Sequence, residues 1–83
     1  MQNNSQSFNT IFMEVLVFKT SVRNRTNVQS VSAALDSLSG VLKWNFDLQD
    51  ADNILRVEAR ELSPRNVELV LQYAGFACEE LPD

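Results

Sequence analysis

The chain has 83 residues, 45% of them hydrophobic, which fits one small domain with a single core. Its 11 acidic and 7 basic side chains give a formal net charge of -4, which argues against a nucleic-acid partner because phosphate binding depends on clustered Lys and Arg. A lone cysteine closes no intramolecular disulfide, and no stretch approaches the roughly 20 apolar residues of a membrane span, so we expect a cytoplasmic protein without a membrane partner.

The start of the chain divides into two segments of different composition. Residues 1–10 are rich in Asn, Gln and Ser, which cannot offset the entropy of ordering, so the sequence predicts a flexible N-terminal tail. Residues 11–83 are expected to form the single domain. Within it, residues 11–19 are dense in β-branched and aromatic side chains, which predicts a strand that is apolar on both sides and therefore central.

A helix is predicted next, over residues 28–38. Its apolar stripe, at three- and four-residue spacing, consists of Val28, Val31, Leu35 and Leu38. Thr26 and Gln29 form a candidate capping box at its start. Gly40 supplies the left-handed turn that commonly ends a helix.

Two alternating segments then predict a β-hairpin. In residues 41–49 the apolar side of the strand is formed by Leu42, Trp44, Phe46 and Leu48. Residues 50–53 have the composition of a turn, and a second alternating segment occupies residues 54–60. The two strands are expected to pair antiparallel and to share one apolar face.

A second helix and a last strand complete the pattern. Ser63 and Pro64 are typical of a helix start, Gly75 of a helix end, and residues 76–81 predict a short edge strand. The order β-α-β-β-α-β predicts an α+β, ferredoxin-like fold, in which two helices cover one face of a four-stranded antiparallel sheet. Right-handed crossovers place the first and third strands in the centre of that sheet.

Several segments of this pattern resemble the heavy-metal-associated (HMA) domain family. They are residues 18–27 with Val28 and Val31, then Gly40-Val41, Trp44, Asp47, residues 52–58 and Ala74-Gly75-Phe76. The resemblance spans Val15 to Leu81 and fits the short, carrier-like single-domain members of the family. It implies the ferredoxin-like fold.

The resemblance also implies where a metal site would lie. The family carries Met-x-Cys-x-x-Cys after the first strand, and its two thiolates bind copper(I), zinc or a similar soft ion. The matching positions here are Val22 for the methionine and Asn24 and Asn27 for the two cysteines. Asparagine amides are weak, uncharged ligands that do not replace thiolates, so we expect no metal and no cofactor.

The loop therefore has three readings. Its asparagine amides cap the following helix, which is the interpretation we favour, or they form a residual metal site, or the loop contacts an anionic group of a partner. The last reading rests on Lys19, Arg23 and Arg25, which bring positive charge to the start of a helix.

Other reactive or acidic groups point to structural roles. Cys78 lies beside two glutamates, which raise a thiol pKa, so we expect a small buried residue rather than a reactive thiol. Asp47, Asp50 and Asp52 lack the spacing of an EF-hand loop and predict a solvated turn. Without histidine or a Gly-rich loop the usual catalytic pairs are missing, so an enzyme is not expected.

One face of the predicted sheet is left bare by the helices. It would carry Met13, Val15, Val17 and Ile54, and exposed apolar patches usually mark contact surfaces. We therefore expect a small non-enzymatic HMA-like domain that acts as a protein-interaction module, with itself in a weak homodimer or with another protein. The alternative is a degenerate metal-handling, chaperone-like protein that still contacts metal transport partners, or that binds metal between two chains through Cys78.

Overall fold

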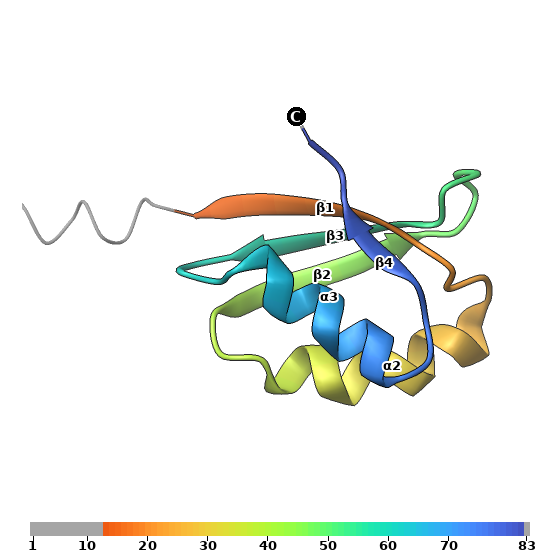
Figure 1. Ribbon diagram of the computed structural model, residues 1–83, viewed down its shortest axis with the longest axis horizontal. Helices are drawn as coiled ribbons and strands as arrows, with labels where there is room; N and C mark the ends of the chain where they lie inside the picture. Colours follow the sequence, from red (N-terminus) through yellow and green to blue (C-terminus); the bar gives the residue numbers. More distant parts are fainter. Residues whose placement is uncertain (1–12, 83) are drawn as a thin grey trace, which may run out of the picture.

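The computed structural model describes residues 13–82, so the predicted tail of residues 1–10 lies outside the described residues. The elements are β1 (Glu14–Thr20), α2 (Arg25–Ser37), β2 (Val41–Asp47), β3 (Ile54–Ala59), α3 (Pro64–Tyr73) and β4 (Cys78–Glu80). Both helices lie on the same side of the sheet, as Figure 1 shows. The predicted ferredoxin-like β-α-β-β-α-β order is confirmed.

The sheet has four strands in the order β2-β3-β1-β4, and each neighbouring pair is antiparallel. The first and third strands are therefore central, as the right-handed crossovers predict. In the register, Val17 lies opposite Arg56, and Lys19 lies opposite Glu79. The strand that is apolar on both sides is thus placed between two neighbours.

The core fills the space between the sheet and the helices. Its fully buried large side chains are Phe18, Leu35, Leu55, Leu71, Val22, Val31, Val57 and Val67. Apart from Val22, which lies in the loop after β1, they come from β1, from alternate positions of β3 and from one stripe of each helix, because strands repeat every two residues and helices every 3.6. Burying one such side chain contributes roughly 1.5–3 kcal/mol.

The first residues of β2 depart from the predicted alternation. The register moves from Val41 opposite Ala59 directly to Lys43 opposite Glu58, so Leu42 is an extra residue in a β-bulge. Leu42 is 50% exposed, and Val41 packs against the core instead. The prediction that Leu42 shares the apolar side of Trp44 is therefore wrong, because the bulge resets the alternation.

The second helix begins as predicted, with the Ser63 hydroxyl accepting a hydrogen bond from the Arg65 N–H, and it ends before Gly75, whose φ is +96°. The strand predicted over residues 76–81 is shorter than expected. The N–H of Phe76 still donates to the carbonyl of Leu71, so Phe76 belongs to the helix end and does not pair with β1. Pairing with β1 is thereby confined to β4 and the residue after it, Leu81, whose N–H donates to the carbonyl of Val17.

Candidate functional site

The loop between β1 and α2 is held at both sides by short hydrogen bonds. The buried hydroxyl of Thr20 donates to the carbonyl of Asn53 at 2.7 Å and accepts from the N–H of Val22 at 3.1 Å. Ser21 exchanges two hydrogen bonds with Ala77, one through its N–H and one through its hydroxyl oxygen. Val22, which follows these residues, is fully buried. The loop path is therefore fixed by the two segments that flank it.

Asn24 and Asn27 cap the first helix with their side-chain amides. Asn24 is the N-cap residue, in an extended conformation, and its Oδ1 accepts from the N–H of Asn27 at 2.9 Å. The Oδ1 of Asn27 accepts in turn from the N–H of Arg23 at 3.1 Å. The predicted capping box of Thr26 and Gln29 is wrong, because the helix begins at Arg25 and the preceding amide takes the cap.

This geometry does not fit a soft metal ion. Both amide oxygens accept backbone N–H groups, and a neutral amide oxygen is a hard, weak donor for copper(I). Within residues 13–82, no three His, Cys, Asp or Glu side chains gather in an arrangement that could hold a metal ion. In this loop both asparagine side chains are engaged with backbone N–H groups at the helix start.

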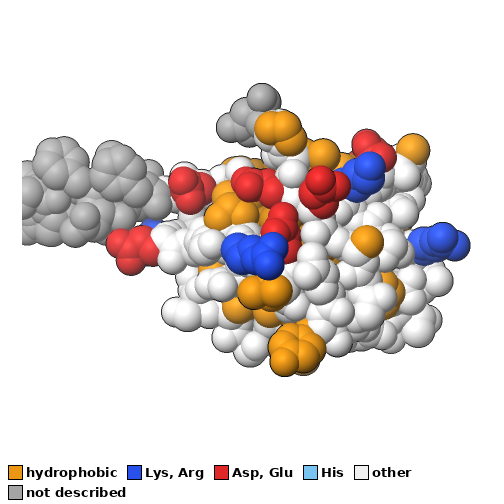
Figure 2. Space-filling view, viewed as in Figure 1, with side chains coloured by type: hydrophobic (Ala, Val, Ile, Leu, Met, Phe, Trp, Pro, Cys, Tyr) orange, Lys and Arg blue, Asp and Glu red, His pale blue; other side chains and the backbone are white. Residues whose placement is uncertain are grey.

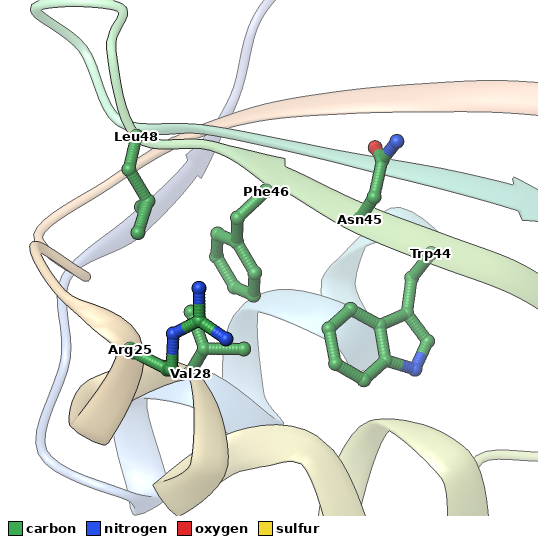
Figure 3. A pocket seen from close by; sticks show the side chains of 6 residues that line it. All are labelled: Arg25, Val28, Trp44, Asn45, Phe46 and Leu48. Carbon is green, nitrogen blue, oxygen red and sulfur yellow. The ribbon is translucent and has the colours of Figure 1, made fainter.

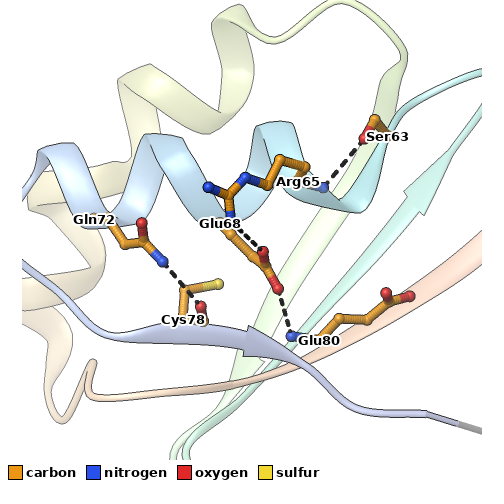
Figure 4. Close-up of polar contacts among 6 residues, drawn as sticks. All are labelled: Ser63, Arg65, Glu68, Gln72, Cys78 and Glu80. Carbon is orange, nitrogen blue, oxygen red and sulfur yellow. Dashed lines mark hydrogen bonds and ion pairs between the residues drawn. The ribbon is translucent and has the colours of Figure 1, made fainter.

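Cys78 lies at the start of β4, under α3. It is 5% exposed, and burial raises the pKa of its thiol from 9.0 to about 12, with the carboxylate of Glu68 adding to the effect. The sequence assigned the raised pKa to the adjacent glutamates, whereas burial is the main cause and the helix supplies the charge. Figure 4 shows Glu68 and Gln72 of α3 bonded to the backbone of β4, at Glu80 N–H and the Cys78 carbonyl.

The raised pKa predicts a loss of stability in alkaline solution. In the unfolded chain the thiol ionises above pH 9.0, whereas in the folded chain it keeps its proton until about pH 12. Folding stability should fall through that window, by up to about 1.4 kcal/mol per pH unit. Urea unfolding of the native chain and of Cys78→Ala, at about pH 8 and about pH 10.5, isolates this contribution. An equal pH dependence in the two proteins would contradict it.

The three predicted basic residues do not point to one place. Lys19 lies on the open face of the sheet, opposite Glu79 in the register. Arg25 opens α2 and lines a hollow beside β2. Arg23 is exposed between them, in the loop. Figure 2 shows Lys and Arg side chains standing apart on the visible face, while acidic side chains gather in its upper part.

A hollow of about 290 Å³ lies between the start of α2 and β2. Its lining consists of Arg25, Val28, Trp44, Asn45, Phe46 and Leu48, as Figure 3 shows. The Trp44 and Phe46 rings meet edge to face, with centroids 5.8 Å apart, and the indole N–H donates to Asp36 at 2.7 Å. The sequence predicted these rings on the apolar side of the strand, and on this outer strand they are half-buried and pack against the core.

The uncovered face of the sheet carries the predicted apolar residues. Met13 is 46% and Val15 48% exposed, while Val17 and Ile54 are partly buried. Leu81 lies beside Val17 through its backbone hydrogen bond and extends this apolar strip, a residue that the sequence reading missed. Leu81 lies two residues after Glu79 in the predicted last strand, and this spacing could have shown that both side chains lie on the same face.

Two of the three aspartates near the hairpin, Asp47 and Asp50, accept backbone hydrogen bonds with their carboxylates. The Oδ1 atoms of Asp47 and Asp50 accept from the N–H groups of Gln49 and Asp52, at 3.1 and 2.8 Å. Asn53 follows with a φ of +48°, a conformation that asparagine tolerates in turns. These carboxylates therefore close a tight turn, which is the structural role predicted for them.

Comparison with solved structures identifies the class of fold. The HMA domain of a copper chaperone for superoxide dismutase is 20% identical, with 84% of this chain and 68% of that chain covered and a TM-score of 0.69. The yeast copper transporter domain CCC2A is 21% identical, with 83% of this chain and 96% of that chain covered and a TM-score of 0.71. The N-terminal domain of ZntA is 24% identical, with 84% of this chain and 94% of that chain covered and a TM-score of 0.73.

The predicted resemblance to HMA domains is therefore confirmed in the fold, and the chain has one cysteine, Cys78, with asparagines at positions 24 and 27. No protein-family model and no curated protein matches the sequence. In the described part of the chain, no helix is long and apolar enough to cross a membrane.

Proposed function

We propose that this HMA-like domain has lost the metal function of its fold and serves as a non-enzymatic protein-interaction module in the cytoplasm. The observation that carries the proposal is the apolar strip on the open face of the sheet, formed by Met13, Val15, Val17, Ile54 and Leu81. No described helix covers this face, because α2 and α3 both pack on the other one. Binding of a partner that removes such apolar surface from water is favourable in free energy.

Polar residues surround the strip and give it selectivity. Arg56 lies directly opposite Val17, Glu58 lies opposite Val15, and Lys19 lies opposite Glu79. Such charges steer a partner and fix its orientation more than they add affinity. Lys19, which lies on this open face, would meet carboxylates of the partner. The buried, un-ionised thiol of Cys78 supports a non-enzymatic role, since a nucleophile must be accessible and ionised.

Replacing Val17 by lysine tests the proposal. Val17 is central in the strip and its side chain points away from the core, so the fold should persist, while a buried, unpaired ammonium would weaken any contact through this face at least tenfold, or about 1.4 kcal/mol. Titration of the native chain and of the variant with a candidate partner protein measures the contact.

Leu69→Lys is the matched control. Leu69 is 42% exposed on α3, on the opposite side of the molecule, so the same chemical change there should leave the contact intact. Equal effects of the two substitutions, or a tight contact that survives Val17→Lys, would count against the sheet face as the docking surface.

The alternative function, contact with metal transport partners, is favoured by the solved structures with this fold, which include copper chaperone and copper transporter domains. Titration with a purified Cys-x-x-Cys domain of that class, with and without copper(I), separates the two: binding to such a domain supports the alternative. The burial of Cys78 argues against metal shared between two chains at its sulfur, since the thiol is 5% exposed and keeps its proton to about pH 12.

A further inference from the structure

The two edges of the sheet differ in their capacity to pair with another strand. Within residues 13–82, β2 pairs only with β3, so one side of its seven-residue backbone is without a strand partner. At the other edge β4 has three residues and is followed closely by Pro82, which has no N–H to donate. An extended strand added to this protein would therefore pair along β2.

The side chains of β2 are self-complementary about Asn45. On the open face, Lys43 and Asp47 lie two residues to either side of Asn45, with opposite charges. On the helix side, Trp44 and Phe46 lie one residue to either side. A strand with this symmetry matches an antiparallel copy of itself in both charge and shape.

We propose that two copies of this chain pair antiparallel along β2, about a two-fold axis at Asn45, and so join two four-stranded sheets into one. Lys43 of each copy then faces Asp47 of the other, and Trp44 of each faces Phe46 of the other. A two-fold interface of this kind is closed, so it ends at a dimer and does not propagate into fibres.

The hollow beside β2 fits this arrangement. Its aromatic walls, Trp44 and Phe46, are open toward the strand edge, where the same rings of the second copy would cover them (Figure 3). Arg25, at the start of α2, lies near Phe46 and Leu48. Asp36, near the end of α2, accepts a hydrogen bond from the indole N–H of Trp44. The two-fold therefore places Arg25 of one copy at the level of Asp36 of the other.

A charge exchange tests the pairing on the full chain. Lys43→Glu or Asp47→Lys alone places like charges opposite each other at both ends of the interface, and should raise the dimer dissociation constant at least tenfold. The double variant Lys43→Glu/Asp47→Lys restores opposite charges and should restore dimerisation. Analytical ultracentrifugation from about 10 µM to about 1 mM measures all four proteins.

The control variants separate this interface from the sheet face. Lys19→Glu changes the charge as Lys43→Glu does but lies on β1, and Val17→Lys disrupts the open face, so both should dimerise like the native chain. Thermal unfolding reports whether each variant is folded, which matters for Lys43→Glu because it meets Glu58 in its own sheet. A native chain that is monomeric at about 1 mM, or a folded double variant that stays as weak as the singles, overturns the proposal.

A disulfide trap gives a second readout. Antiparallel residues directly opposite each other have Cα atoms about 4.5–5.5 Å apart, a separation that a disulfide spans. Asn45→Cys in a Cys78→Ser background should therefore form a covalent dimer rapidly in oxidised glutathione, and Asn66→Cys, an exposed position on α3, should not. Equal rates of cross-linking at the two positions overturn the two-fold at Asn45.

Discussion

Replacing Phe18 by alanine is expected to lower the free energy of unfolding by about 3–5 kcal/mol. Phe18 is fully buried at the centre of β1, between β3 and β4 and under the helices, so its removal leaves a cavity as well as losing the transfer free energy of the ring. Urea unfolding, followed by circular dichroism, measures the change in the midpoint at constant slope.

The expected loss is a large share of the total stability. A chain of 83 residues has a free energy of unfolding of roughly 4–12 kcal/mol. The matched control is Val15→Ala, on the same strand but 48% exposed on the other face, and its effect should be below about 1 kcal/mol. Comparable losses at the two positions would show that the helix side of the sheet is not the core.

The fold could be predicted because several local patterns agreed. The strand that is apolar on both faces became the central β1, the period-two segments became β2 and β3, and the cap at Ser63 was read correctly. Each of these patterns reflects burial or an unpaired backbone N–H group, which short stretches of sequence reveal.

The errors arose where two local solutions competed. Asn24 and Thr26 are both good caps, so the local sequence does not decide between them, and in the structure Asn24 takes the cap. The bulge at Leu42 depends on how β2 meets β3, so no alternation within β2 alone predicts it.

The sequence predicted those features of the site that depend on one short segment, and it missed those that depend on two elements lying side by side. The positions Asn24 and Asn27 were correctly assigned to the helix start, because capping is local. The hollow beside β2 was missed, since it requires α2 and an edge strand to be placed together. Whether Trp44 is core or surface depends on its strand being the outermost one.

Replacing Asn24 and Asn27 together by cysteine is expected to create a copper(I) site. The loop is tied to Asn53 and to Ala77, and the two positions lie three residues apart across the helix start, so we expect two cysteine sulfurs there to reach one ion. The N-terminus of a helix lowers thiol pKa values and helps the thiolates to form. Competition against a chromogenic chelator under reducing conditions measures the uptake.

Stability should change in two opposite steps. Without metal, loss of the two capping amides should cost about 1 kcal/mol each. With free copper(I) at about 100 times the dissociation constant, binding to the folded state should add about 2.7 kcal/mol. The native chain, whose amides accept backbone N–H groups and whose Cys78 is buried, should take up copper(I) no better than Cys78→Ser.

The controls separate ligand chemistry from loop geometry. Asn24→Ser/Asn27→Ser keeps hydroxyl caps without a soft ligand, so it should stay close to the native chain in stability and take up no copper(I). Each single cysteine should bind far more weakly than the pair, because one thiolate lacks its partner. A folded double cysteine variant that takes up no copper(I) would mean that the amide caps have changed the path of the loop itself. The likeness to HMA domains would then extend to the sheet and helices and end at this loop.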